Sequence, residues 1–481
     1  MRLVEWLLVV AEMSATVSVW MLYGGTPSWL TWLIAASIFL LFVHALIEGV
    51  HWQLGPAYLA CCFLVLYLTP IGHGRVAVLA LPITVAILIL TSLVFSWALP
   101  MFQLPEPSGD YPVGTRIFFM TDTRRRETHD EAIQGDRQIV VQLWYPAADS
   151  KGRRACYRRL KETTRLSSYQ AVLRTNSIEN AALPNGRFPV LVFNHAWGDF
   201  RNRCTYSFQD LASHGFIVVS ISHTYNSGVV ALADGRVVHH NQFDVGFDCP
   251  DHIPLEDRLA LADEELRIQT DDCRFVLDSL EEFDRTPGHL LEKHIDTGKV
   301  GTYGYSFGGA VSVEFAKEDP RVGAALQLDG VLHGNGALEG LNKPFMAIDS
   351  SVMKRHESPS GAVDSLGATA IMMKRSADAK VATLVRFGGY RVCIGDMNHG
   401  SFSDKIFMSP LGGLSGRTGI PPVRCAEILN GYALAFFQQS LLKRPSPLLS
   451  EEAKSFPEAE LRIFPSPRNT ECEPDAVGSR A

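Results

Sequence analysis

The sequence predicts an α/β fold, a mostly parallel sheet flanked by helices, preceded by an all-α bundle of about four transmembrane helices. Two observations carry this prediction. The first hundred residues hold only five charged side chains, and the rest of the chain alternates short apolar runs with helical patterns. Such alternation is typical of strand–helix–strand units, whose parallel strands share one sheet.

Residues 1–100 are the expected transmembrane region. A helix that crosses a membrane needs about 20 mostly apolar residues. The expected spans are residues 4–23, 28–48, 54–72 and 76–99. Glu5 and Glu12 make the first span costly in lipid, so a signal peptide is an alternative for that span alone. The alternative for the whole region is a buried helical subdomain, which four such uncharged runs disfavour.

Charge placement predicts the orientation of this region. If all four spans cross the membrane, Arg2 and the cluster Arg124–Arg126 lie on one side and Arg75 lies on the other. Positively charged residues accumulate on the cytoplasmic side of membrane proteins. We therefore expect a multi-pass membrane protein whose larger domain is cytoplasmic; three spans with a cleaved or interfacial first segment are the alternative and would reverse this orientation.

Composition argues against several classes of site. The formal net charge of −7 gives no support for nucleic-acid binding. The nine cysteines are dispersed without a Cys-x-x-Cys pair, so a zinc or redox site is not indicated. His239 and His240 have no carboxylate at helical ligand spacing, and no phosphate-binding or dinucleotide glycine motif is present. We expect no metal and no cofactor.

The larger domain is expected over residues 115–443, after a linker at 101–114 and before a disordered tail at 444–481 that is rich in Pro, Ser and Glu. Its expected strands are residues 115–121, 138–145, 189–194, 216–221, 299–304, 323–329, 344–350 and 389–396. The first two strands have no helix between them and should form an antiparallel hairpin.

Two helices and two irregular stretches complete the domain. Helices are expected at 256–284, where an apolar stripe ends at Pro287-Gly288, and at 421–442. Residues 223–255 are expected to be an insertion at the rim of the site, and residues 353–388 to be a flap.

The central motif is Gly304-Tyr305-Ser306-Phe307-Gly308, which follows an expected strand and opens a run of small, helix-like residues. A tight strand-to-helix turn leaves no room for side chains two positions either side of the serine, and glycines remove that collision. The serine hydroxyl then lies at a helix N-terminus, where negative charge is favoured. This pattern predicts the nucleophile elbow of an α/β-hydrolase. A solvated serine in a glycine-rich turn is the alternative, which the flanking patterns disfavour.

Partners for Ser306 follow in the order serine, acid, histidine that this fold uses. Asp329 ends the strand at 323–329, where a carboxylate can orient an imidazole, and a turn aspartate is the alternative reading. His399 lies in a loop just beyond the last expected strand. Asp396 also ends a strand near His399, so it remains a second candidate for the acid.

An oxyanion hole needs two backbone N–H groups. The residue after the nucleophile, Phe307, supplies one. The second is expected in the loop after the strand at 189–194, where the amide of Trp197 is the candidate donor.

These residues carry a resemblance to the plasma-type platelet-activating factor acetylhydrolase family. The resemblance spans roughly residues 107–442 and is strongest at 193–222, Gly304–Ala310, Leu328-Asp329-Gly330 and Met397-Asn398-His399. It implies a calcium-independent esterase with Ser306, Asp329 and His399 as its triad, and with the Trp197 and Phe307 amides as its oxyanion hole. The chain departs from the family at Tyr305, where the family usually has His, and at Ala196, where it usually has Gly.

The resulting hypothesis is a membrane-anchored serine ester hydrolase that releases short acyl groups from lipids such as platelet-activating-factor-like phospholipids. The first alternative is a general carboxylesterase, or a polyester or dienelactone-type hydrolase. The second is a non-catalytic membrane receptor or scaffold with a decayed hydrolase domain. The complete order of serine, acid and histidine argues against decay.

Overall fold

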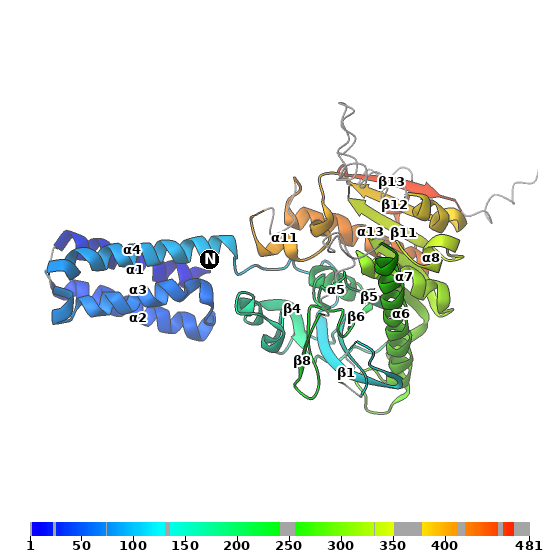
Figure 1. Ribbon diagram of the computed structural model, residues 1–481, viewed down its shortest axis with the longest axis horizontal. Coiled ribbons are helices and arrows are strands. Elements are labelled where there is room, and N and C mark those ends of the chain that lie inside the picture. The colour runs from blue at the N-terminus through cyan, green and yellow to red at the C-terminus, as the bar shows by residue number, and fades with distance from the viewer. Residues whose placement is uncertain are drawn as a thin grey trace, which may run out of the picture. The chain divides into compact units, whose positions relative to one another are not determined.

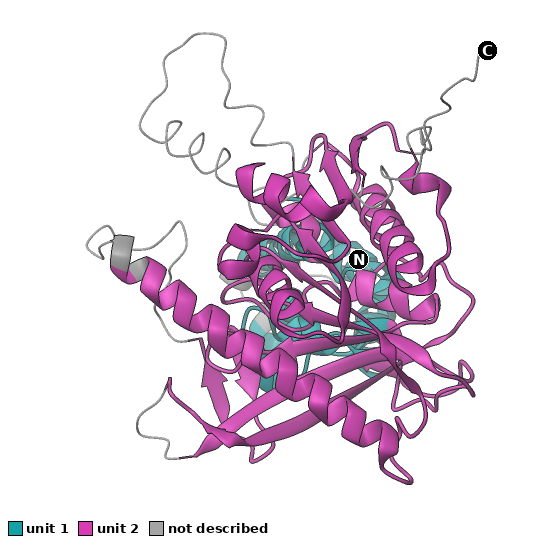
Figure 2. Ribbon diagram, turned by 90° about the vertical axis from the view of Figure 1, so that its right-hand side faces the viewer, with its two compact units in different colours: residues 1–103, 156–175, 405–415 teal, residues 104–155, 176–404, 416–481 magenta. Residues whose placement is uncertain are grey.

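The structure is a computed structural model that describes residues 2–22, 26–73, 75–129, 135–240, 255–330, 332–350, 378–411, 419–450 and 456–465. The chain divides into two compact units (Figure 2). The first contains residues 1–103, 156–175 and 405–415, and the second contains residues 104–155, 176–404 and 416–481. Each unit is described by itself.

The first unit is built on four helices, which run alongside one another in Figure 1. Their bounds are α1 Leu3–Leu22, α2 Ser28–Ile47, α3 Gly55–Tyr67 and α4 Arg75–Ala98, with 3₁₀ turns at η1 Trp52–Leu54 and η2 Pro70–His73. Short connections make successive helices antiparallel. The start of α1 therefore lies beside the end of α2.

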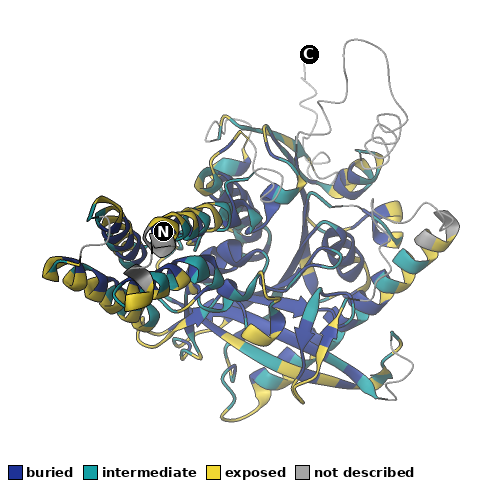
Figure 3. Cartoon of the chain, turned by 60° about the vertical axis from the view of Figure 1, so that its left-hand side comes forward, coloured by how far each residue is buried: buried dark blue, intermediate teal, exposed yellow. Residues whose placement is uncertain are grey.

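The helices bury mostly small and branched residues against one another and leave many large apolar side chains exposed. Figure 3 shows buried and exposed residues along the same helices. Leu30 and Ile34 of α2 are fully buried, whereas Trp32 on the same helix is 75% exposed. Water disfavours such an outer surface and lipid favours it. Three helices, at Leu3–Leu22, Ser28–Ile47 and Leu79–Ala98, are long and apolar enough to cross a membrane.

The third expected span, residues 54–72, is shorter in the structure than the sequence predicted. Helix α3 has 13 residues and ends at Tyr67, and η2 begins at Pro70. At 1.5 Å per residue such a helix is about 20 Å long, which is less than the thickness of a hydrocarbon core. Pro70 has no backbone N–H and disfavours the helical conformation at the residue before it, which is consistent with the early end of α3.

Two segments of the first unit come from distant parts of the sequence. The Trp52 indole N–H donates to the carbonyl oxygen of Leu166 at 2.9 Å, and the Ser409 hydroxyl donates to that of Ala98 at 2.6 Å. Helix α11, Lys405–Met408, belongs to this unit. Deleting residues 1–100 would therefore remove one hydrogen-bond partner from each of the segments 156–175 and 405–415.

The second unit is organised around a mixed sheet with the strand order β13-β12-β11-β10-β9-β5-β6-β2-β1-β4-β3. The strands are β1 Val113–Arg126, β2 Asp136–Pro146, β3 Arg154–Cys156, β4 Arg174–Glu179, β5 Phe188–Asn194, β6 Ile217–Ser222, β9 Ile295–Tyr305, β10 Val322–Leu328, β11 Phe345–Ser350, β12 Gly389–Ile394 and β13 Ala459–Phe464. Strands β7 Val229–Ala231 and β8 Val237–His239 form a separate hairpin.

The centre of the sheet is parallel, as predicted. Strands β6, β5, β9, β10, β11 and β12 pair in parallel, and β1 and β2 form the expected antiparallel hairpin. Tyr305 of β9 pairs with Leu328 of β10, so these two strands end at the same level. The residues that follow them emerge side by side at the carboxyl edge.

Helices cover both faces of the sheet. They are α5 Thr205–Ser213, α6 Leu255–Arg285, α7 Phe307–Glu318, α8 Asn335–Glu339 and α13 Pro422–Leu442. Alternate residues of β5 point to opposite sides. Val192 joins the core that α6 and α7 cover, whereas Phe193 packs on Phe208 of α5. This two-sided burial explains why the central strands read as continuous apolar runs.

Three predictions concern segments outside the central sheet and its covering helices, and their outcomes differ. Residues 459–464, inside the expected disordered tail, instead form β13, which pairs antiparallel with β12. The expected flap falls mostly on residues 351–377, which lie outside the described residues. The expected insertion at 223–255 is described up to residue 240 and contains the β7–β8 hairpin.

Candidate active site

Ser306 lies in the tight turn between β9 and α7. Its backbone has φ 58° and ψ −122°, a conformation that non-glycine residues rarely adopt. The turn is held from the neighbouring strand, because the Ser306 N–H donates to the carbonyl oxygen of Leu328 at 3.0 Å. Strain of this kind persists only where surrounding structure fixes it, and it projects the hydroxyl from the sheet edge.

The two glycines around Ser306 are required by close backbone contact. A Cβ at Gly304 would lie 2.0 Å from the carbonyl oxygen of Gly308, and a Cβ at Gly308 would lie 2.0 Å from that of Asn194. No side chain fits at such distances. The turn therefore packs directly against the end of β5.

Asp329 follows β10 directly. Its N–H donates to the carbonyl oxygen of Ile348 at 2.7 Å, and its Oδ1 accepts the N–H of Ser350 at 2.8 Å. Both partners belong to β11, the next strand of the sheet. These bonds fix the carboxylate and leave Oδ2 to contact a histidine.

His399 begins the 3₁₀ turn η6, His399–Phe402, after β12. Asn398 caps the turn with Ser401, and the Tyr305 hydroxyl donates to the carbonyl oxygen of His399 at 2.8 Å. The Tyr305 ring also lies under the imidazole, with centroids 4.9 Å apart. Tyr305, the departure from the family pattern, thus supports the histidine by contact and by hydrogen bond.

The structure brings the three predicted side chains together. His399 Nδ1 lies 2.7 Å from Asp329 Oδ2, and His399 Nε2 lies 3.0 Å from Ser306 Oγ. The His399 side chain is 51% exposed, so the group is open to solvent. Asp396, the second candidate for the acid, is exposed, and the imidazole Nδ1 is instead bonded to Asp329.

The two predicted oxyanion donors lie on adjacent segments. The rings of Trp197 and Phe307 meet edge to face, with centroids 4.9 Å apart. Within the part of the chain that the structure describes, neither backbone N–H has a hydrogen-bond acceptor. Backbone donors without an acceptor at the end of a sheet are available to an oxyanion.

His195 shapes the loop that carries Trp197. Its Nδ1–H donates to the carbonyl oxygen of Ala196 at 2.7 Å, and its Nε2 accepts the Ser227 hydroxyl at 2.6 Å. Burial, and then the neighbouring His223, lower the pKa of His195 to about 3. The neutral ring therefore keeps this tautomer and holds the loop.

Sequence reasoning missed a buried chain of polar side chains behind this loop. Arg137 Nε donates to Asp272 Oδ1 at 2.7 Å, and His223 Nδ1 lies 3.0 Å from Asp272 Oδ2. His223 Nε2 then faces Asn194 Oδ1 at 3.2 Å, and Asn194 donates to Ser312 of α7 at 2.9 Å. This series of hydrogen-bonded side chains thus links β2 and α6 to α7, which begins directly after Ser306.

The positive charge of Arg137 keeps Asp272 ionised among these buried side chains. Burial alone would raise the pKa of Asp272, but the Arg137 guanidinium and hydrogen bonds from Arg137 and His223 lower it far below its usual range. One signal was present in the sequence. Asp272 lies beside Cys273 on the inward face of a helix whose other inward residues are mostly apolar.

Replacing Asp272 with asparagine should strongly destabilise the second unit. The change leaves the Arg137 charge buried with less compensation, and breaking a buried ion pair costs about 3–5 kcal/mol. We expect the midpoint of thermal inactivation of esterase activity to fall well below that of the unmodified chain. Asp278→Asn, at a 43%-exposed aspartate of the same helix, is the matched control and should have little effect. An equal shift in both variants would contradict the prediction.

Comparison with known proteins identifies relatives of this chain. The family described as platelet-activating factor acetylhydrolase, isoform II, matches residues 98–445. A probable 1-alkyl-2-acetylglycerophosphocholine esterase of Arthroderma benhamiae is 23% identical over 399 residues, which cover 74% of this chain and 93% of that protein. Platelet-activating factor acetylhydrolase of Bos taurus is 27% identical over 211 residues, which cover 40% of this chain and 46% of that protein.

Among solved structures, a ferulic acid esterase from Streptomyces cinnamoneus superposes with a TM-score of 0.60 and 26% identity, covering 75% of this chain and 99% of that one. The mixed sheet, the flanking helices and the turn at Ser306 are those of an α/β-hydrolase. From the match over residues 98–445, the chain belongs to the platelet-activating factor acetylhydrolase isoform II family of ester hydrolases.

Proposed function

We propose that the chain is a membrane-anchored serine ester hydrolase that releases short acyl groups from lipids resembling platelet-activating factor. One observation carries the catalytic part: His399 lies 3.0 Å from the Ser306 hydroxyl and 2.7 Å from the Asp329 carboxylate. The strained serine at φ 58°, with both partners in place, is expected in a working active site and not in a decayed domain.

In the proposed reaction His399 Nε2 takes the proton of Ser306 as Oγ attacks the ester carbonyl carbon. The Trp197 and Phe307 amides donate to the oxyanion that forms. His399 then gives its proton to the leaving alcohol, and an acyl-Ser306 ester remains. A water molecule, deprotonated by His399, attacks this ester; the bond between the acyl carbon and Ser306 Oγ breaks, the proton on His399 returns to Oγ, and the acid leaves. Asp329 holds the Nδ1–H tautomer and stabilises the imidazolium.

The substrate class rests on the relatives. A fungal relative is named as an esterase of 1-alkyl-2-acetylglycerophosphocholine, an acetyl ester of a lipid, and a bovine relative as an acetylhydrolase of platelet-activating factor. The solved relative is named a ferulic acid esterase, which supports a general carboxylesterase as the alternative.

Hydrolysis of matched substrates by the full chain in detergent micelles tests this assignment. We expect kcat/KM for a 2-acetyl glycerophosphocholine to exceed that for its 2-palmitoyl counterpart by at least about 10-fold, which pocket contacts to a few methylene groups can supply. Ethyl ferulate is the third substrate, and Ser306→Ala provides the background. Faster cleavage of the palmitoyl or feruloyl ester would favour the alternative.

The membrane anchor is proposed from the apolar helices. Their outer surfaces carry large apolar side chains, including Trp20, Trp29 and Trp97, each at least half-exposed and near a helix end, where interfacial tryptophans usually lie. If α3 crosses as well as the three longer helices, Arg2 and Arg124–Arg126 would lie on the cytoplasmic side with the hydrolase domain; if it does not, the hydrolase domain would lie on the side opposite Arg2.

Full-length protein in membranes should resist both high salt and alkaline carbonate and should enter solution only with detergent. The reason is that exposing the apolar helix surfaces to water is energetically unfavourable. Fractionation followed by immunoblotting measures this, with a peripheral and an integral membrane protein as markers. Recovery of the chain with the peripheral marker would contradict the proposal.

A further inference from the structure

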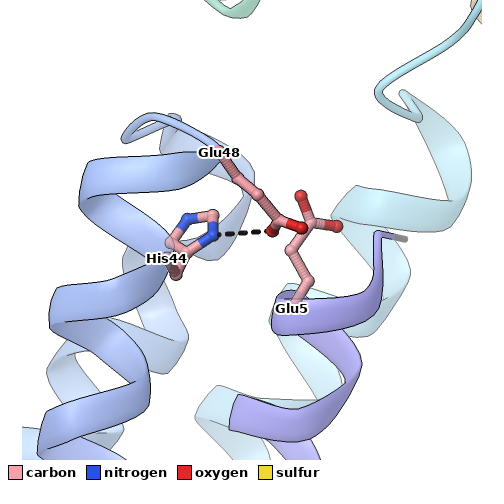
Figure 4. Close-up of side chains that lie close together, drawn as sticks. All are labelled: Glu5, His44 and Glu48. Atoms are coloured by element: carbon pink, nitrogen blue, oxygen red, sulfur yellow. Dashed lines mark hydrogen bonds and ion pairs between the residues drawn. The ribbon is translucent and has the colours of Figure 1, made fainter.

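The end of the helical bundle contains a compact cluster of side chains that the hydrolase reaction does not use. Glu5 comes from the first turns of α1, and His44 and Glu48 come from the last turn and C-cap of α2. One ligand atom from each lies within 4.8 Å of the other two. Figure 4 shows both carboxylates close to the imidazole of His44.

The sequence did not predict this cluster, and it predicts no metal site. His44 and Glu48 are four residues apart and share one helix face. The third residue, Glu5, is brought to them only because α1 and α2 are antiparallel neighbours. Glu5 and His44 are 1% and 0% exposed, and the side chain of Glu48 is 10% exposed, so the cluster is largely shielded from water.

We propose that Glu5, His44 and Glu48 bind one divalent cation of the Zn²⁺ or Co²⁺ type. Nitrogen and carboxylate oxygen are ligands of such ions, and tetrahedral ligand atoms around them lie about 3.3 Å apart. His44 Nδ1 already lies 3.1 Å from Glu48 Oε2. The C-terminal end of α2, where Glu48 lies, carries partial negative charge that further favours a cation.

The outer contacts of the cluster match those around bound metals. Metal-ligating histidines usually hydrogen-bond through their other nitrogen, and ligating carboxylates are themselves hydrogen-bonded. His44 Nε2 lies 2.8 Å from the Tyr58 hydroxyl. Glu5 Oε2 accepts the backbone N–H of Arg2 at 2.8 Å, and Glu48 Oε1 accepts that of Val4 at 3.3 Å.

His51 is a further nitrogen ligand beside the cluster. Its Nε2 lies 3.1 Å from Glu5 Oε1, and its Nδ1 lies 3.1 Å from Gln53 Oε1. Gln53 is oriented by its own N–H bond to Leu99, so both ring nitrogens face acceptors. A neutral imidazole has only one N–H. The proposed cation at Nε2 would satisfy this nitrogen and would make His51 a fourth ligand beside Glu5, His44 and Glu48.

A metal-free arrangement is the rival. Arg2 Nε donates to Glu5 Oε1 at 2.7 Å and lies 3.8 Å from Glu48 Oε2. Arg2 together with a protonated His51 would neutralise the two carboxylates without a metal. The two arrangements differ in one measurable respect, which is whether the chain binds a cation at these residues.

The test uses the full chain in detergent, purified through a tag without histidine and stripped with a chelator. Co²⁺ titration should give the visible absorption of a four-coordinate ion, with one Co²⁺ per chain that Zn²⁺ displaces. Glu5→Gln and His44→Gln should lose this absorption, and Tyr58→Phe should weaken Co²⁺ affinity about 10- to 100-fold. Glu12→Gln, a buried glutamate on the same helix, is the matched control and should bind normally.

Folding is checked by circular dichroism, and Zn²⁺ should raise the Tm of the unmodified chain and of Glu12→Gln because a bound ligand stabilises the folded state. If Glu5→Gln does not fold, His51→Gln, which lies outside the α-helices, replaces it and should also weaken binding. Absence of Co²⁺ absorption and of the Zn²⁺-dependent rise in the unmodified chain would overturn the proposal. So would unchanged binding in His44→Gln and His51→Gln, which would place the ion elsewhere.

Discussion

Replacing Ser306 with alanine should reduce ester hydrolysis by about 10⁴-fold or more. The members of a triad act as a unit, so without the hydroxyl no acyl-enzyme forms, and only the weak catalysis of an oxyanion hole and substrate binding remains. The measurement is kcat/KM for a short soluble ester with the purified full chain.

Covalent labelling separates loss of the nucleophile from loss of the fold. A fluorophosphonate probe should modify the unmodified chain and should not modify Ser306→Ala. Ser279→Ala, on α6, is the control and should keep both activity and labelling. Labelling that persists in the Ser306 variant would remove this residue from the reaction.

Asp329→Asn should reduce kcat by about 10⁴-fold while leaving the backbone in place. An asparagine amide keeps the size of the side chain but favours the wrong imidazole tautomer, so His399 can no longer accept the serine proton. The Ser350 N–H that bonds to Oδ1 can still find an acceptor in asparagine. Rate measurements with saturating ester show the loss directly.

Asp396→Asn is the matched comparison, because Asp396 was the competing acid in the sequence. Its side chain is exposed, and we expect a loss of less than about 10-fold, as for most surface substitutions. A severe loss in Asp396→Asn together with a mild one in Asp329→Asn would reverse the assignment of the acid.

The parts of the site that the sequence could predict depend on local geometry. Gly304 and Gly308 are needed because of contacts within one turn and with one neighbouring strand, so their spacing around Ser306 is visible in the chain itself. The central strands were predictable for a similar reason, since burial on both faces makes each one apolar throughout.

Features that depend on distant contacts were not predictable in this way. Asp329 is the predicted acid, but its position at a strand end does not exclude Asp396; the paired ends of β9 and β10 are what bring Asp329 beside Ser306. His223 and Asp272 meet across 49 residues of sequence, and neither has a local pattern. The strand β13 lies within a polar stretch, and it forms because the edge of β12 offers a backbone partner.

The position of β13 also bears on how the chain is made. Gly389 at the start of β12 pairs with Phe464, so the ribosome must synthesise past residue 464 before the strand leading to His399 gains its outer neighbour. At about 5–20 residues per second, the apolar helices emerge many seconds before this pairing becomes possible. Delivery of the nascent chain to a membrane can therefore precede completion of the sheet, and a ribosome stalled shortly before residue 459 would expose an unfinished sheet edge.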